Sequence, residues 1–375
     1  MRLLTIVGTR PEAIKMAPLV AEARRRGARV VVCATAQHRR MLDQVLELFD
    51  IRPDHDLDLM RPDQTLADLT ARAIAALDPV VARERPDWVL VQGDTTTAMV
   101  GALVAFYRGL PVGHVEAGLR TGDLRRPFPE ELNRRVADIV AAAHFAPTAG
   151  ARAHLEREGV DASTIHVTGN TVVDALEAVR AMPPPPADVV PEIAPDERLV
   201  VVTAHRRESF GPGMAAIARA LARIAREHAD VRIVYPVHPN PNVVGPMREI
   251  LGTAERVHLV EPLAYLPFVH LMARAYLVIS DSGGVQEEAP SLGVPALVLR
   301  EVTERPEAIE AGAVRLVGVD SDAIAAAAGQ LLRDREAWSR MARVVNPYGD
   351  GRASERIVAI LRGEPWTPFV ATGAT

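Results

Sequence analysis

Short apolar runs alternate with longer amphipathic stretches along this chain. Residues 13–26 and 96–108 place apolar side chains at helical spacing, and each stretch lies between two of the runs. In the first half of the chain, the apolar runs that we expect to form strands are residues 3–7, 30–34, 88–92, 111–115, 143–146 and 165–168. Strands that alternate with helices are typical of parallel sheets with helical crossovers.

The same alternation starts again after four consecutive prolines at residues 183–186. Neither a helix nor an interior strand accepts such a run, so we expect a loop there. The apolar runs that follow are residues 199–203, 231–236, 257–260, 276–280, 296–299 and 314–317. Two sets of strands predict an α/β fold with two doubly wound, Rossmann-like domains that face a central cleft, where such proteins bind ligands.

The length of 375 residues also favours two domains, because a single core rarely grows beyond about 250–300 residues. We expect an N-terminal domain over residues 1–170 and a C-terminal domain over residues 171–355. The stretch 171–180 has helical spacing and suits either domain. For residues 356–375 we expect a tail that returns to the N-terminal domain.

Composition excludes several classes of protein. The net charge of −5 lacks the basic excess that nucleic-acid binding requires. No apolar run approaches the roughly 18 residues of a membrane span. Cys33 is the only cysteine, and it lies in an apolar run, which indicates a core residue in a reducing compartment. We therefore expect a cytoplasmic protein without a nucleic-acid or membrane partner.

Lys15 is the only lysine, although the chain has 43 lysine and arginine residues in total. It follows the first apolar run by eight residues, near the expected end of the first strand. An ammonium is a compact point charge on a flexible stem, and arginine does not replace it at a geometrically demanding site. A solvated position on a helix surface is the alternative interpretation.

Carboxylates follow two apolar runs of the first half. Asp94 and Glu116 each come after a predicted strand, and Glu130 and Glu131 lie at a probable helix start. Three carboxylates in one cleft suit proton transfer to and from carbon, provided that their surroundings raise at least one pKa. Helix capping explains Asp94 equally well, and the positive end of a helix explains Glu130 or Glu131.

The second half offers an anion site and two histidines. The segment Ser282-Gly283-Gly284 follows a predicted strand and opens a helix, where backbone N–H groups can approach a phosphate. A tight turn capped by Ser282 is the alternative. Glu288 is placed to bind a sugar hydroxyl, or is simply solvated. His205 is the histidine best placed to titrate.

His238 repeats the arrangement of His205 one strand later. Neither histidine has a second histidine at close ligand spacing, so a metal site is not expected.

Several segments together resemble the bacterial, non-hydrolysing UDP-N-acetylglucosamine 2-epimerases. They are residues 8–15, 92–97, 115–121, 204–211, 235–241, 281–292 and 303–308. The resemblance runs from about residue 2 to about residue 360. It implies the B-type glycosyltransferase architecture and an isomerase that interconverts UDP-N-acetylglucosamine and UDP-N-acetylmannosamine for surface polysaccharide synthesis.

In that family, UDP is eliminated to leave 2-acetamidoglucal and is then re-added. The resemblance implies no nicotinamide, no metal and no other cofactor, with UDP-N-acetylglucosamine and UDP as ligands and a homodimer as the assembly. The chain carries no Gly-x-Gly-x-x-Gly fingerprint after a strand, which agrees with the lack of a nicotinamide.

The resemblance also assigns roles residue by residue. It implies acid/base roles for Asp94, Glu116 and Glu130, with His205 assisting. Glu130 is preferred to Glu131 because it directly follows the proline of the family's Pro-Glu-Glu. The residues implied to bind UDP are Arg10, Lys15, Leu263, Phe268, Ser282, Gly283, Gly284, Glu288 and Arg305.

Some family members bind a second UDP-N-acetylglucosamine as an activator. The candidate allosteric residues here are Gln37, His38 and Arg206. The chain departs from the family pattern at Arg40, where a glutamine is usual, and at Asp63, where an arginine is usual. A carboxylate repels a diphosphate, so we expect weakened or absent activation.

Three other functions stay open from the sequence. A hydrolysing epimerase would release free N-acetylmannosamine and UDP from a nearly identical site. A glycosyltransferase would use the same nucleotide half-site, and a nucleotide-sugar sensor would bind without turnover. Three carboxylates in one cleft make a pure sensor the least favoured of these.

Overall fold

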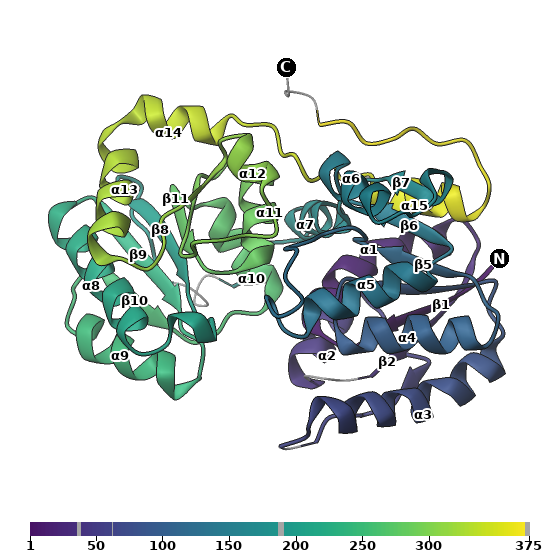
Figure 1. Ribbon diagram of the computed structural model, residues 1–375. Coiled ribbons are helices and arrows are strands. Elements are labelled where there is room, and N and C mark those ends of the chain that lie inside the picture. Colours follow the sequence, from purple (N-terminus) through teal and green to yellow (C-terminus); the bar gives the residue numbers. More distant parts are fainter. Residues whose placement is uncertain (36–38, 62, 187–190, 372–375) are drawn as a thin grey trace. The chain divides into compact units, whose positions relative to one another are not determined.

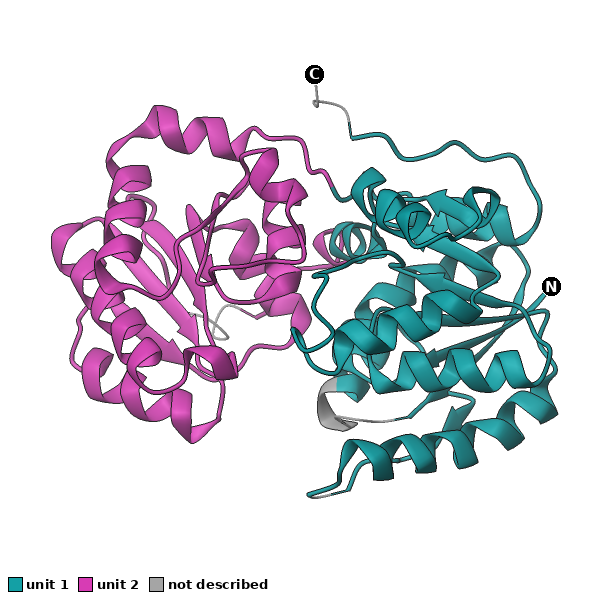
Figure 2. Cartoon of the chain, viewed as in Figure 1, with its two compact units in different colours: residues 1–178, 348–371 teal, residues 179–347, 372–375 magenta. Residues whose placement is uncertain are grey.

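The computed structural model describes residues 1–35, 39–61, 63–186 and 191–371. The chain forms two compact units (Figure 2). Unit 1 contains residues 1–178 and 348–371, and unit 2 contains residues 179–347. Each unit is a parallel sheet with helices between its strands (Figure 1), so the predicted fold of two Rossmann-like domains is confirmed.

Unit 1 has a seven-stranded parallel sheet in the order β3-β2-β1-β4-β5-β6-β7. Its strands are β1 (Arg2–Val7), β2 (Arg29–Ala34), β3 (His55–Asp56), β4 (Trp88–Gln92), β5 (Val112–Val115), β6 (Ala143–Ala146) and β7 (Ile165–Val167). Its helices are α1 (Arg10–Arg25), α2 (Arg39–Leu48), α3 (Leu66–Glu84), α4 (Thr96–Tyr107), α5 (Glu130–Val140), α6 (Ala149–Arg157), most of α7 (Thr171–Arg180) and α15 (Ala353–Leu361).

Unit 2 has a six-stranded parallel sheet in the order β10-β9-β8-β11-β12-β13. Its strands are β8 (Arg198–Thr203), β9 (Val231–Pro236), β10 (Val257–Val260), β11 (Leu277–Ser280), β12 (Ala296–Val298) and β13 (Val314–Leu316). Its helices are α8 (Pro212–Glu227), α9 (Pro241–Leu251), α10 (Tyr265–Ala273), α11 (Gly283–Ser291), α12 (Glu307–Glu310), α13 (Ser321–Arg333) and α14 (Arg335–Ala342).

In each sheet the strand order reverses at one point. In unit 1, β1 pairs with β2 on one side and with β4 on the other, and in unit 2, β8 pairs with β9 and with β11. The loops at such a reversal separate and leave space at the carboxyl ends of the strands. The candidate residues after β1 and β4, and those after β8 and β11, therefore occupy the places where this fold binds ligands.

Each sheet buries its own apolar core. In unit 2, residues of β8, β9 and β11 pack against α8, α9 and α13. In unit 1, residues of β1, β2 and β4 pack against α3 and α4. Strands buried on both faces read as continuous apolar runs, which explains why the runs in the sequence locate them so closely. Strand β3 has only two residues and no apolar run, so no pattern predicted it.

Residues 348–371 belong to unit 1. Helix α15 packs against α1, and Arg26 of α1 pairs with Glu364 at 2.8 Å. The backbone N–H groups of Ala353 and Ser354 donate to Asp174 of α7. Burial raises the pKa of Asp174 to about 6, although these hydrogen bonds act to lower it.

The two joins between the units lie at residues 178–179 and 347–348, whereas we expected them at 170 and 355. The difference has a packing cause. Helix α7 buries Val172, Val173 and Leu176, and its Asp174 holds the start of α15. Helical spacing alone could not assign residues 171–180 to one sheet, because it does not show which core their apolar face enters.

Candidate functional site

The loop after β1 is built around a buried carboxyl group, Glu12. Its Oε2 accepts from the Gly8 N–H at 3.1 Å and the Thr9 hydroxyl at 2.7 Å, and its Oε1 accepts from the Thr95 hydroxyl at 2.8 Å. Burial raises the pKa of Glu12 to about 7, although these hydrogen bonds act to lower it. Glu12 thus ties the loop after β1 to the loop after β4.

Lys15 is buried and contacts Glu116, so the alternative of a solvated helix position is wrong. The side chains of both residues are 7% exposed, and Asn170 Nδ2 donates to Glu116 Oε2 at 2.9 Å. Glu116 has a φ of 65°, an uncommon conformation for a residue with a side chain. Backbone strain of this kind is often found at functional sites, where surrounding contacts hold the residue in place.

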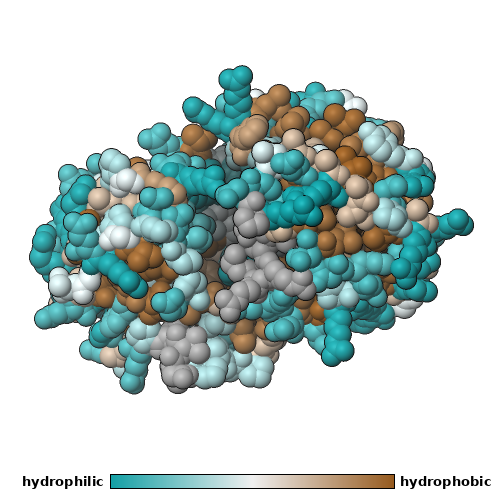
Figure 3. Space-filling view, turned by 90° about the horizontal axis from the view of Figure 1, so that it is seen from below, coloured by the Kyte–Doolittle hydropathy of each residue, from teal (hydrophilic) through white to brown (hydrophobic). Residues whose placement is uncertain are grey.

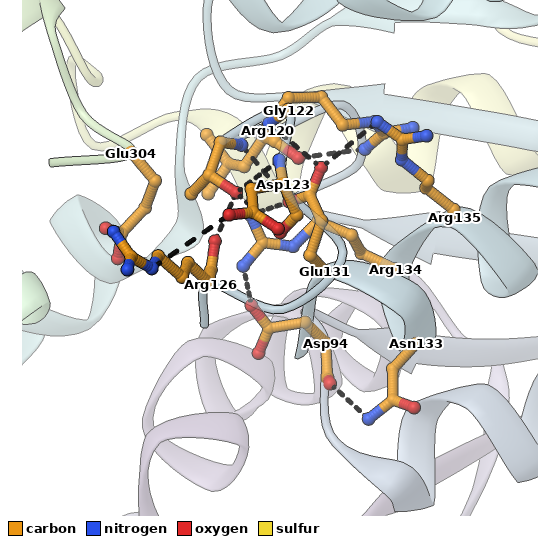
Figure 4. A network of polar contacts seen from close by, with 12 residues as sticks. Asp94, Arg120, Gly122, Asp123, Arg126, Glu131, Asn133, Arg134, Arg135 and Glu304 are labelled. Carbon is orange, nitrogen blue, oxygen red and sulfur yellow. Dashed lines mark hydrogen bonds and ion pairs between the residues drawn. The ribbon is translucent and has the colours of Figure 1, made fainter. Parts of the chain in front are cut away.

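Asp94 lies in the turn between β4 and α4 and does not cap the helix. Thr95 is the N-cap residue of α4, and its hydroxyl accepts from the Ala98 N–H. The Asp94 carboxylate pairs with Arg134 of α5 and is 31% exposed, while Asn133 holds the Asp94 carbonyl at 2.9 Å. Figure 4 shows both contacts. The capping alternative is therefore wrong, and Asp94 has an oriented carboxylate that remains accessible.

Glu130 and Glu131 differ in their surroundings. Glu131 is fully buried, and it accepts from the N–H groups of Thr121 and Gly122 at 3.1 and 3.2 Å (Figure 4). It also lies 3.3 Å from Arg134. Glu131 thus stabilises the loop between β5 and α5 through these hydrogen bonds. Glu130, the first residue of α5, is half-buried, which favours it as the candidate acid/base residue.

In unit 2, Asp281 organises the loop that carries His205. Asp281 directly follows β11, is fully buried, and accepts from the backbone N–H groups of His205 and Arg206 at 2.7 and 2.8 Å. His205 Nδ1 lies 3.6 Å from Asp281 Oδ1. The exposed His205 ring stacks on His238, with 5.4 Å between the ring centroids. Burial, followed by the neighbouring His205, lowers the pKa of His238.

The start of α11 has the features of an anion site. Ser282 occupies the N-cap position, but its side chain makes no capping hydrogen bond, so the alternative of a turn capped by Ser282 is wrong. A Cβ atom at Gly283 would lie 2.8 Å from Arg305 Nη1. A side chain at residue 283 would therefore crowd the Arg305 guanidinium at the first turn of α11. A guanidinium beside a helix N-terminus is favourable for a phosphate.

Two carboxylates hold Arg305 in this position. Glu287 accepts from Arg305 Nε at 2.7 Å, and Glu304 accepts from Arg305 Nη1. Burial acts to raise the pKa of Glu304, but Arg305 and Arg300 hold it well below its usual range. The guanidinium is thus fixed on two sides by carboxyl groups.

Glu288 is buried, so the alternative of a solvated glutamate is wrong. It accepts from the Tyr265 hydroxyl at 2.8 Å, which links α11 to the start of α10. The half-buried Leu263 and Phe268 flank that point, one before α10 and one within it. The candidate residues of unit 2 therefore gather around the starts of α10 and α11 and the loop after β8.

Four further candidate residues were predicted from the sequence, and the structure describes two of them, Arg10 and Arg206. Arg10 is the half-buried first residue of α1, beside the Glu12 loop. Arg206 is held through its backbone N–H by Asp281. Gln37 and His38 lie outside the described residues. Among the described residues, no group of three or more histidine, cysteine, aspartate or glutamate side chains could hold a metal ion.

Five residues that shape these sites were not predicted from the sequence. Glu12 and Arg134 each had a readable signal, because Glu12 follows a Thr-x-x-Glu capping pattern and Arg134 lies one helical turn after Glu130. No signal in the sequence links the other three residues to their partners across the fold. They are Asn170, Tyr265 and Asp281.

Comparisons with known proteins agree on one family. The model of the UDP-N-acetylglucosamine 2-epimerase family matches residues 21–362. The UDP-N-acetylglucosamine 2-epimerase of Escherichia coli is 54% identical over 370 residues, which cover 96% of this chain and 98% of that protein. Within the described part of the chain, no helix is long and apolar enough to cross a membrane.

Solved structures give the same result. A crystal structure of UDP-GlcNAc 2-epimerase from Neisseria meningitidis bound to UDP-GlcNAc has a TM-score of 0.91 at 45% identity, and the match covers 97% of this chain and 100% of that chain. The Methanocaldococcus jannaschii UDP-GlcNAc 2-epimerase in complex with UDP-GlcNAc and UDP has a TM-score of 0.81 at 33% identity, with the same coverage.

Proposed function

Because this chain belongs to the UDP-N-acetylglucosamine 2-epimerase family, we propose that it interconverts UDP-N-acetylglucosamine and UDP-N-acetylmannosamine without hydrolysis. The observation that carries the proposal is the pair of carboxylates at the ends of two adjacent strands. Asp94 and Glu116 follow β4 and β5, which pair in parallel, and their carboxylates contact Arg134 and Lys15, respectively. Two oriented carboxylates can remove a proton from one face of a carbon atom and return a proton to the other face.

The reaction needs proton transfer at carbon 2 and loss of UDP from carbon 1. One carboxylate takes the proton from carbon 2, the electron pair of that C–H bond forms the double bond of 2-acetamidoglucal, and the bond from carbon 1 to the UDP oxygen breaks. On return, the UDP oxygen attacks carbon 1, and a second acid protonates carbon 2 on its other face. Asp94, Glu116 and Glu130 are the candidates for these roles, and His205 assists.

Unit 2 supplies the groups that hold the leaving UDP. Ser282, Gly283 and Gly284 present the start of α11 to the phosphates, and Arg305 adds a fixed positive charge. Positive groups aimed at a developing oxyanion lower the barrier for its departure. Glu288 is assigned to a sugar hydroxyl, Leu263 and Phe268 to the uracil, and Arg10 and Lys15 of unit 1 to the UDP side of the substrate.

Turnover of UDP-N-acetylglucosamine in deuterated buffer, followed by proton NMR, tests the proposal. We expect UDP-N-acetylmannosamine to accumulate and deuterium to enter carbon 2 of both nucleotide sugars. Accumulation of free N-acetylmannosamine and UDP would instead indicate a hydrolysing enzyme. The absence of deuterium at carbon 2 would contradict epimerisation and favour a glycosyltransferase or a binding protein.

We also propose that activation by UDP-N-acetylglucosamine is weak or absent. Asp63 is exposed and negatively charged where an activating diphosphate would need a cation. Initial rates should follow a hyperbolic curve without a lag, and a strongly sigmoidal curve would contradict this. Asp63→Arg is the variant that should introduce sigmoidality.

A cytoplasmic homodimer is our proposal for location and assembly. The single cysteine, Cys33, is buried, which suits a reducing compartment. The underside of unit 1 shows several apolar areas (Figure 3). Exposed apolar side chains on the adjacent helices α4 and α5 include Tyr107 and Ile139, which are 68% and 81% exposed, and such side chains suit a subunit interface. Light scattering on Ile139→Arg should report a monomer where the parent chain is a dimer.

A further inference from the structure

A chain of alternating charges starts at Asp94. The Asp94 carboxylate pairs with Arg134, which lies 3.3 Å from Glu131 (Figure 4). Glu131 lies 3.4 Å from Arg135, and Arg135 lies 3.7 Å from Glu158. Each ion pair thus joins a carboxylate to a guanidinium, and all five residues belong to unit 1.

The same chain of charges continues inward and returns to its start. Glu158 accepts from Arg120 at 2.7 Å, and Arg120 donates to Asp138 Oδ2 at 2.7 Å. The other oxygen of Asp138 lies 2.5 Å from His114 Nδ1. His114 Nε2 lies 2.7 Å from the carbonyl oxygen of Gly93, the residue before Asp94. The charges therefore form a closed ring through the turn that carries Asp94.

The contacts of His114 determine how many protons it carries. A backbone carbonyl oxygen can only accept a hydrogen bond, so Nε2 has to donate to Gly93. Arg120 donates to the other oxygen of Asp138, and its positive charge favours the ionised carboxylate, so Nδ1 has to donate to Asp138. Two donating ring nitrogens require two ring protons. His114 is fully buried, and an imidazolium at that depth needs the carboxylate beside it.

The charge count leads to the same result. The ring contains the four carboxylates of Asp94, Glu131, Glu158 and Asp138 and the three guanidinium groups of Arg134, Arg135 and Arg120. A positively charged His114 balances the set, whereas a neutral His114 would leave one negative charge in excess. Burial acts against it, but the Asp138 carboxylate raises the pKa of His114, which agrees with the contacts.

We propose that His114 is a permanently charged positioning residue, which closes this ring and fixes the Gly93–Asp94 turn for proton transfer. Gly93 has a φ of 70°, a backbone conformation that favours glycine. A charged hydrogen-bond donor on the Gly93 carbonyl strongly restricts the conformation of this turn. The other charged group that faces His114 is Arg120, whose positive charge opposes protonation of the imidazole. Asp138 offsets that repulsion because it lies between the two cations.

His144 provides a matched control histidine. It lies on β6, next to β5, and is also buried, and its Nε2 contacts the backbone carbonyl of Asp138 at 2.9 Å. Its Nδ1 lies 3.2 Å from the hydroxyl of Thr164, which itself donates to the Asp161 carbonyl at 2.8 Å, so neither of these two ring contacts is with a carboxylate. Burial lowers the pKa of His144, so a neutral ring is expected there.

Long-range nitrogen–proton NMR on protein with ¹⁵N-labelled histidine rings tests the charge of His114. Between pH 7 and pH 8 we expect both ring nitrogens of His114 to be protonated and one ring nitrogen of His144 to be bare. His114→Gln and His144→Gln assign the signals. A bare ring nitrogen on His114 in the folded wild-type protein would overturn the proposal. Asp138→Asn provides a second test, because His114 should then lose one ring proton.

The positioning role rests on the proposed epimerase activity and is tested by kinetics. His114→Gln should lower kcat about a hundred-fold, because small displacements of an acid/base group are that costly, and should leave KM nearly unchanged. His144→Gln should keep the wild-type kcat. An unchanged kcat in folded His114→Gln would overturn the positioning role. A wild-type protein without epimerase activity would instead overturn the proposed function, and the NMR result would still stand.

Discussion

Asp94 in unit 1 and Asp281 in unit 2 occupy comparable places and have different surroundings. Both follow a strand at the point where the strand order of their sheet reverses. Asp281 is fully buried, and one of its oxygens accepts from two backbone N–H groups. Asp94 is 31% exposed, and its carboxylate contacts a guanidinium rather than the backbone of a loop.

The difference shows that position in the fold is not enough to assign chemistry to a carboxylate. A carboxylate that satisfies backbone donors stabilises a loop, and one that stays accessible with a single fixed counter-charge can exchange a proton. Glu131 and Glu130 repeat the contrast on one helix, since Glu131 holds backbone N–H groups while Glu130 is half-buried at the helix start.

Asp94→Asn should have the largest effect on activity. We expect kcat to fall by about 10²–10⁴-fold, the usual contribution of a general acid or base, with little change in UDP affinity. Turnover assays and titration calorimetry with UDP measure the two quantities. Equal losses of turnover and UDP affinity would contradict the acid/base role.

The matched variant of unit 2 is Asp281→Ala. It leaves the N–H groups of His205 and Arg206 without their acceptor, which should cost about 1–3 kcal/mol of stability. Urea unfolding measures this change. If Asp281→Ala keeps full stability, or if Asp94→Asn loses as much, the contrast between the two aspartates fails.

Lys15→Arg should lower kcat about ten- to a hundred-fold, although it keeps the charge. Lys15 is buried against Glu116, and a planar guanidinium is larger than the compact ammonium that it would replace there. Arg25→Lys, an exposed position on the same helix, should leave kcat unchanged. Wild-type kcat in Lys15→Arg would show that the Glu116 contact does not matter for turnover.

Gly283→Ala should weaken UDP binding about ten-fold, a loss near 1.4 kcal/mol. The new methyl group would overlap Arg305 and push the guanidinium away from α11. Gly245→Ala is the control, because a Cβ atom there meets no other atom within 4 Å. Equal UDP affinity in both variants would show that Arg305 does not act on the phosphates.

Glu12→Gln should change the pH dependence of stability in unit 1. Since burial raises the pKa of Glu12 from 4.5 to about 7, the folded state keeps a proton that the unfolded state releases. Stability therefore falls as pH rises between these values and stays lower above them. The variant should reduce that fall by on the order of 1–3 kcal/mol, measured as urea midpoints from pH 4.5 to pH 8. Parallel curves for both proteins would contradict the prediction.

The sequence predicted the fold closely because strands that are buried on both faces consist of consecutive apolar residues, which are easily recognised. It also predicted which strand ends carry polar groups, including Asp94 and Glu116. It could not pair those groups with their partners, since Lys15 and Glu116 lie 101 residues apart and meet only through the sheet register. Burial of Glu131 and Asp281 depends on loop paths, which no local pattern encodes.

The chain passes between the units twice, so unit 1 is assembled from both ends of the sequence. A ribosome finishes residues 179–347 of unit 2 before it makes Tyr348–Ala371, the segment that α1 and Asp174 hold in unit 1. During synthesis the second half of the chain can therefore complete its fold first. Loss of residues 348–371 would leave unit 1 incomplete. The face of α1 that packs on α15 would then be exposed to water and to proteases.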